Sequence, residues 1–278
     1  DDLSPAFEAE SLALAKKYLA QLQEVDLTKI DASAQLSHRL LSQELQHEID
    51  DYRWRHHNYP VNQMHGLHAQ VPSMLINMHQ VDTVADAEAY IARLNALPKL
   101  FDQLIDGMKV RADLGVIPPK FVFPLVIDDN RNLIQGAPFN GDEPSTLLAD
   151  FDRKLAGLEA EQTEKDTLRK AAIEALLQST GPAYEKLISY LTLLEKKADT
   201  RAGAWKFPNG EAFYNNALSR TTTTELDAET IHNTGLAEVT RIHDEMRAIM
   251  KKVEFKGDLP AFFEFMRTDK QFYYPETE

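Results

Sequence analysis

Apolar residues recur at intervals of three and four along most of this chain, the spacing that places side chains on one face of an α-helix. The clearest stripes run through residues 7–22, 36–52, 90–108, 187–194 and 231–249. Residues that cap helices precede several stripes: Ser4 before Pro5, Asp31, Thr83 with Asp86, and Asp227. The pattern therefore predicts a mostly α protein, a bundle-like array of long helices.

Residues 116–143 are the one long stretch without a helical pattern. Aromatic and β-branched residues at its start are interrupted by Pro124, and Gly, Asn and Pro turn signals follow. We expect an irregular or short-hairpin insertion there, with a sub-boundary of the chain as one option. Residues 1–278 are otherwise interpreted as a single helical region, in which Pro98 should kink or divide the helix predicted after Thr83.

Composition narrows the classes of function. The chain has 30 Lys and Arg against 44 Asp and Glu, a net charge of −14. A protein with this negative net charge repels the phosphate backbone of nucleic acids, so we expect no nucleic-acid partner. The absence of Cys excludes disulfides, thiolate metal sites and a Cys nucleophile. No apolar run approaches the roughly 20 residues that a membrane-spanning helix needs, so we expect no transmembrane segment.

The two ends of the sequence are abrupt. The chain opens at Asp1 without an initiator Met and closes on an aromatic-rich stretch around Tyr273 and Tyr274. We interpret both ends as the result of truncation, which would make residues 1–278 a part of a larger protein.

No complete catalytic motif is present. The nearest approach to the zinc signature His-Glu-x-x-His begins at His47, but Asp51 occupies the second His position. Five histidines between residues 56 and 79 offer another metal hypothesis, in which His65 and His68 share one helical turn. The competing interpretation is a polar surface whose imidazoles form local hydrogen bonds. We therefore assign no metal ligand and no catalytic residue in this chain.

Residues 205–243 are the most distinctive segment. An aromatic stretch from Trp205 to Tyr214 is followed by four threonines at 221–224 and a helix that begins near His232. A hydroxyl-rich entry to a helix can hydrogen-bond a peptide backbone or an anion. Alternatively, the threonines form an extended linker and Gly235 permits a close helix crossing.

This segment resembles the bacterial family known as domain of unknown function 885. There a Gly-x-x-x-Tyr element precedes a threonine-containing stretch and a helix that begins Ile-His-x-x-Gly-Leu-x-Glu-Val. The matching positions here are Gly210, Tyr214, Thr222, Thr223, Ile231, His232, Gly235, Leu236, Glu238 and Val239. The segments Tyr59-Pro60-Val61-Asn62-Gln63 and Phe265-Met266-Arg267-Thr268-Asp269 also follow the family's pattern. The likeness spans most of the chain.

The resemblance implies a long-helix scaffold like that of gluzincin-type metallopeptidases, exported to or lipid-anchored at the cell envelope or periplasm. The family's His-Glu-x-x-Pro-Gly-His zinc motif lies beyond the region matched here. We therefore expect an N-terminal portion that forms part of a substrate cleft and is inactive alone, with zinc only in the full-length hydrolase. Its partners would be its own missing C-terminal region and a peptide substrate, contacted by Tyr214, His232 and the neighbouring Gly210.

A rival hypothesis belongs to another class of function. The chain would be a non-catalytic helical binding or assembly module, which grips a partner through residues 116–143 and the aromatic end.

Overall fold

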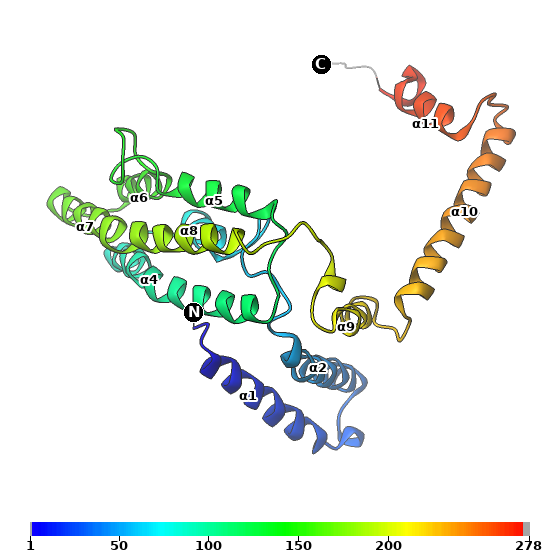
Figure 1. Ribbon diagram of the computed structural model, residues 1–278, viewed down its shortest axis with the longest axis horizontal. Coiled ribbons are helices and arrows are strands. Elements are labelled where there is room, and N and C mark those ends of the chain that lie inside the picture. Colours follow the sequence, from blue (N-terminus) through cyan, green and yellow to red (C-terminus); the bar gives the residue numbers. More distant parts are fainter. Residues whose placement is uncertain (1, 275–278) are drawn as a thin grey trace. The chain divides into compact units, whose positions relative to one another are not determined.

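The computed structural model describes residues 2–274, and within them the chain is all-α (Figure 1). The α-helices are α1 (Pro5–Gln23), α2 (Ala32–Asp51), α3 (Leu67–Asn77), α4 (Val84–Asp113), α5 (Val122–Leu133), α6 (Thr146–Gly157), α7 (Gln162–Ala175), α8 (Gly181–Glu195), α9 (Gly210–Thr222), α10 (Ala228–Lys252) and α11 (Leu259–Thr268). The part of the chain that is described contains isolated β-bridges but no strand. The prediction of a mostly α protein is confirmed.

The chain divides into two compact units, the first ending at Phe213 and the second beginning at Tyr214. Helices α1 to α8 belong to the first unit, whereas α10 and α11 belong to the second. Residues 116–143 lie inside the first unit. Among residues 2–274, no helix combines the length and the apolar character that crossing a bilayer requires.

The predicted helix caps are present. Each capping side chain accepts a hydrogen bond from a backbone N–H in the first turn, which satisfies a donor that has no partner within the helix. The caps are Ser4 on α1, Asp31 on α2, Thr83 on α4 and Asp227 on α10. At Thr83 the Asp86 carboxylate also accepts from the cap's own N–H at 2.9 Å, which completes a capping box.

Helix α4 links two apolar clusters in the first unit. Its N-terminal half, including Tyr90 and Leu94, packs with α3, α6 and α7. Its C-terminal half, including Phe101 and Leu104, packs with α5 and α8. Pro98 lies between these halves, yet α4 continues through it as one helix of 30 residues.

Helices α7 and α8 are continuous through a π-helical turn, Leu176–Thr180. At Gly181 the ring of Phe139 packs so closely that an added Cβ would lie 3.1 Å from it, so glycine lets the 134–145 loop approach the helix.

The prediction of an irregular or hairpin insertion over residues 116–143 is wrong for its central part, which forms α5. Val122, Phe123, Val126 and Ile127 are buried at the i, i+1, i+4, i+5 spacing of one helical face. Pro124 is the third residue of α5, where a backbone N–H has no intrahelical partner to lose. The β-type composition therefore reflected core packing.

Candidate functional site

The segment before α9 is held in the first unit by one buried lysine. The Lys206 side chain is only 3% exposed, and its Nζ lies 3.1 Å from Asp199 Oδ1. The same Nζ donates to the carbonyl oxygens of Ile117 at 3.0 Å and Arg201 at 3.2 Å. A cation that is satisfied by three oxygens anchors the chain near the start of the aromatic stretch.

Asp199 joins this lysine to a second cation. Arg201 Nε lies 2.6 Å from Asp199 Oδ2. The hydrogen bonds from Arg201 and then Lys206 stabilise the carboxylate and lower the pKa of Asp199 to about 2. This charged cluster keeps its ionised form over most of the pH range.

Residues 54–59 form a second segment, which is held by hydrogen bonds from α4. Arg111 donates from Nη2 to the Arg55 carbonyl at 2.8 Å and from Nε to Asn58 Oδ1 at 3.0 Å. Burial lowers the pKa of the Arg111 guanidinium. Burial, followed by the charges of Arg111 and Arg55, also lowers the pKa of His56.

These two fixed segments meet in a cluster of rings that we call the aromatic junction: Trp54, His57, Tyr59, Phe207 and Phe213. Ring centroids lie 5.3 Å apart for Tyr59 and Phe207 and 5.7 Å apart for Trp54 and Phe213. His57 bridges both sides, because its ring lies 5.3 Å from Phe213 and its Nε2 lies 2.9 Å from the Pro208 carbonyl oxygen. Two of the segments that carry the family resemblance therefore lie against each other.

Three residues of the aromatic junction, and His56 beside them in sequence, carry polar atoms without a partner in the described part of the chain. Trp54 Nε1, His56 Nδ1, His57 Nδ1 and Tyr59 Oη are buried and have no hydrogen-bond partner among residues 2–274. Buried polar groups of this kind are usually satisfied by bound water or a ligand. Burial, and secondarily the charge of Asp199, raises the pKa of Tyr59 to about 12, so its hydroxyl keeps its proton as a hydrogen-bond donor.

The residues predicted to contact substrate lie around the start of α9 and of α10. Gly210 is buried as the first residue of α9, and a Cβ there would lie 2.2 Å from the Ala204 carbonyl oxygen. Tyr214, one turn later on α9, is 48% exposed. His232 is exposed on α10. The structure thus places Gly210 and Tyr214 on one helix and His232 on another, and their roles remain predictions.

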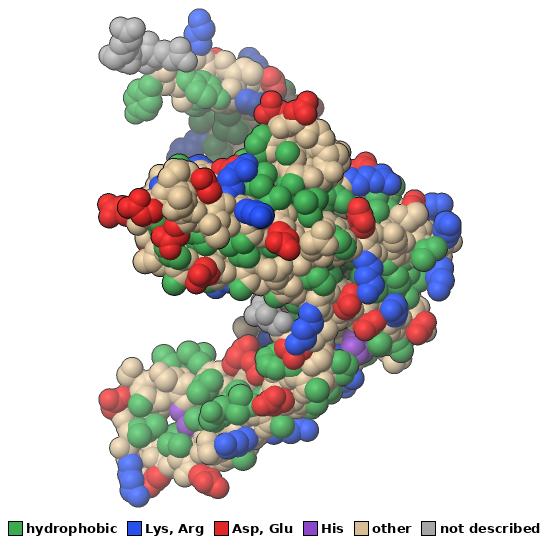
Figure 2. Space-filling model, turned by 90° about the vertical axis from the view of Figure 1, so that its left-hand side faces the viewer, with side chains coloured by type: hydrophobic (Ala, Val, Ile, Leu, Met, Phe, Trp, Pro, Cys, Tyr) green, Lys and Arg blue, Asp and Glu red, His purple; other side chains and the backbone are tan. Residues whose placement is uncertain are grey.

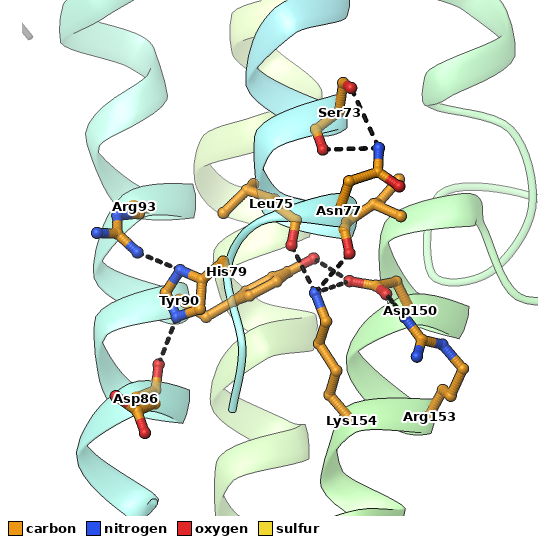
Figure 3. A network of polar contacts seen from close by, with 11 residues as sticks. Ser73, Leu75, Asn77, His79, Asp86, Tyr90, Arg93, Asp150, Arg153 and Lys154 are labelled. Carbon is orange, nitrogen blue, oxygen red and sulfur yellow. Dashed lines mark hydrogen bonds and ion pairs between the residues drawn. The ribbon is translucent and has the colours of Figure 1, made fainter. Parts of the chain in front are cut away.

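A second polar cluster, which was not predicted, lies inside the first unit (Figure 3). Lys154 Nζ lies 2.7 Å from Asp150 Oδ2 and donates to the carbonyl oxygens of Leu75 and Ile76 at 2.5 and 3.1 Å. Tyr90 Oη donates to Asp150 Oδ2 at 3.2 Å. Burial and then Asp150 raise the pKa of Tyr90. One available signal was the i, i+4 spacing of Asp150 and Lys154 beside the apolar Leu147 stripe.

This polar cluster performs a structural task. The carbonyls of Leu75 and Ile76 belong to the last turn of α3, where a helix has no internal donors left. Lys154 supplies the donor and Asp150 compensates its charge. The cluster thereby ties the end of α3 to α4 and α6.

The described residues do not fit a zinc ion. No group of three or more His, Cys, Asp or Glu side chains within residues 2–274 is arranged to hold a metal. His79 uses both ring nitrogens, donating from Nε2 to the Asp86 carbonyl at 2.9 Å and accepting from Arg93 at Nδ1. His65 is exposed while His68 is buried, so the proposed pair does not share one environment.

A shallow pocket of about 260 Å³ lies where the 134–145 loop meets the start of α8. Its lining is Arg131, Ile134, Gln135, Phe139, Asn140, Gly181 and Glu185. The pocket lining combines one aromatic ring with charges of both signs, which does not indicate a particular class of ligand.

Comparison with solved structures gives a similar fold. A crystal structure described as that of the putative lipoprotein from Colwellia psychrerythraea superposes with a TM-score of 0.79 at 21% sequence identity. The match covers 99% of this chain but 48% of that chain, so this chain spans about half the length of the relative. A comparison with curated proteins found no match.

The family comparison covers the whole sequence. The profile described as bacterial protein of unknown function (DUF885) matches residues 1–278. This is the family that the spacing of Gly210, Tyr214, Ile231 and His232 resembles. The chain therefore belongs to the DUF885 family of bacterial proteins.

Proposed function

We propose that this chain is the helical, substrate-contacting part of a longer, zinc-dependent peptidase-like protein of the bacterial cell envelope. The observation that carries the proposal is the aromatic junction, which joins two segments that resemble the family's motifs and lies directly before Tyr214. Tyr214 lies on a helix, and binding residues carried by helices are positioned more precisely than residues carried by loops.

Zinc does not fit the described residues, so its ligands would come from another part of the longer protein. In this proposal the half-exposed Tyr214 binds the peptide through its hydroxyl, and the exposed His232 provides a second polar contact. The length of the solved relative, about twice that of the match, supports a larger parent. The description of that relative as a putative lipoprotein supports a cell-envelope location.

Two preparations test this proposal, the 278-residue chain and the longer protein encoded by its gene. We expect only the longer protein to retain stoichiometric zinc after dialysis and to cleave fluorogenic oligopeptides in a chelator-sensitive way. In the longer protein, Tyr214→Phe should lower kcat/KM about 10-fold or more, because a hydrogen bond to the substrate is lost. Tyr18→Phe is the matched control, since Tyr18 is a similarly exposed tyrosine on α1. Chelator-sensitive cleavage by the 278-residue chain alone would refute the proposal that the zinc ligands lie in another part of the longer protein.

A non-catalytic assembly module remains the second candidate, and one surface favours it. Helices α1 and α2 pack against each other as a hairpin, on which Figure 2 shows hydrophobic side chains in its lower part. Leu14, Leu36 and Leu40 are all exposed there. A pull-down with the hairpin variant Leu36→Glu/Leu40→Glu distinguishes the candidates, because an assembly module would lose its partner while peptide cleavage would persist in an enzyme.

A further inference from the structure

Helix α10 carries a regular apolar stripe that is exposed except at Met246, which is half-buried against the cluster with α11. Its residues recur at intervals of three and four, and we call Leu236, Val239, Ile242, Met246, Ile249 and Val253 the α10 stripe. Val239 is 50% exposed, Ile249 53% and Val253, the residue just after the helix, 57%. Within α10 only Met250 is buried, in a small cluster with α11. Such spacing is typical of a seam between two packed helices.

The charged face of α10, opposite the α10 stripe, argues against a membrane surface as the partner that covers the stripe. Helix α10 contains four acidic and four basic residues, so its charges balance. Arg241 pairs with Glu238 and Glu245, and Arg247 pairs with Asp244, all within the helix. Helices that lie on anionic membranes need an excess of Lys and Arg on the polar face.

The comparison of lengths points to a protein segment instead. The relative that matches 99% of this chain has a further half with no counterpart in these residues. We propose that the α10 stripe is the docking face for an apolar helical segment from that further half of the longer polypeptide. This inference rests on the proposed function only in assuming a longer parent, and it assigns the surface where the two halves join.

Gly235 fits the same surface. It lies four residues before Val239, on the face of the α10 stripe, and a Cβ at Gly235 would meet nothing within 4 Å. Nothing in the described residues therefore requires glycine there. A partner helix that approaches the backbone closely would require it.

Cysteine labelling tests the proposal, because the chain has no Cys of its own. Val239→Cys places a single thiol in the α10 stripe, and Ala248→Cys places a matched thiol on the opposite, exposed face of α10. We expect a maleimide reagent to label both at similar rates in the 278-residue chain. In the longer protein, labelling at 239 should slow at least 10-fold while labelling at 248 stays unchanged.

Each other outcome overturns the proposal. Equal labelling of both thiols in the longer protein would show that its further half does not cover the stripe. In the 278-residue chain, slow labelling at 239 that does not depend on protein concentration would show that the first unit covers the stripe. Slow labelling that becomes stronger with protein concentration would show that a second copy covers it. A gene that encodes nothing beyond residue 278 would also overturn it. Zinc content and peptide cleavage, measured on the same longer protein, report separately on the proposed function.

Discussion

Asp150 and Lys154, one turn apart on α6, form an ion pair almost completely removed from solvent. Their side chains are 4% and 9% exposed, and Lys154 Nζ lies 2.7 Å from Asp150 Oδ2. The pair also connects the last carbonyls of α3 with the Tyr90 hydroxyl of α4. Three helices therefore depend on two charges that cannot reach bulk water.

Removing one of these charges should destabilise the first unit strongly. Asp150→Ala leaves the Lys154 ammonium buried with only carbonyl partners, and we expect a loss of about 3–5 kcal/mol in the free energy of unfolding. Urea denaturation followed by circular dichroism measures it. Asp128→Ala is the control, because it breaks an exposed pair with Arg131 and should cost less than about 1 kcal/mol. Equal losses for both variants would contradict the structural role.

Asp199 should make stability depend on acid. Its pKa falls from 3.8 to about 2 on folding, because Arg201 and Lys206 stabilise the carboxylate. The stabilisation is therefore complete above pH 3.8 and disappears as the pH falls through about 2. We expect the difference in unfolding free energy between wild type and Asp199→Asn to shrink from pH 5 to pH 2. A difference that stays constant over this range would exclude the linkage.

The two glycines of the 205–243 segment should respond oppositely to alanine. Gly210→Ala drives a methyl group into the Ala204 carbonyl and should cost about 1–3 kcal/mol. Gly235→Ala meets open space and should stabilise α10 in the 278-residue chain by up to about 1 kcal/mol, since alanine favours helix. Thermal unfolding of both variants gives the signs. Destabilisation by Gly235→Ala in this chain would mean that another surface already contacts that position.

Pro124 tests the corrected assignment of residues 122–133. In the first turn of α5 its ring occupies a position that needs no N–H donor, so Pro124→Ala should change the unfolding free energy by less than about 1 kcal/mol. Val126→Ala, in the buried face of the same helix, should cost about 1–3 kcal/mol. Comparable effects of both substitutions would argue against this helix register.

Local chemistry made much of the fold predictable. Caps such as Thr83 and Asp227 and the apolar stripes act within one or two turns, so they are visible in sequence, and the structure confirms them. The same local rules did not predict α5. Phe123 and Val126 are residue types that favour strands, but their packing in the core selects a helix.

The contacts around the candidate site could not be predicted in the same way. His57 and Pro208 are 151 positions apart, and only the folded chain brings them together. The family resemblance singled out Gly210, Tyr214 and His232. It did not indicate the ring contacts of Phe207 with Tyr59 and Phe213. The buried pair of Asp150 and Lys154 escaped notice, because charged residues one turn apart usually lie on a solvated face.

The length of α4 has a consequence for how the first unit unfolds. At 30 residues it extends about 45 Å and contributes side chains to both apolar clusters. Because both clusters pack on the same helix, we expect the unfolding of one cluster to destabilise the other. The two clusters should consequently lose amide protection together, as one cooperative folding unit.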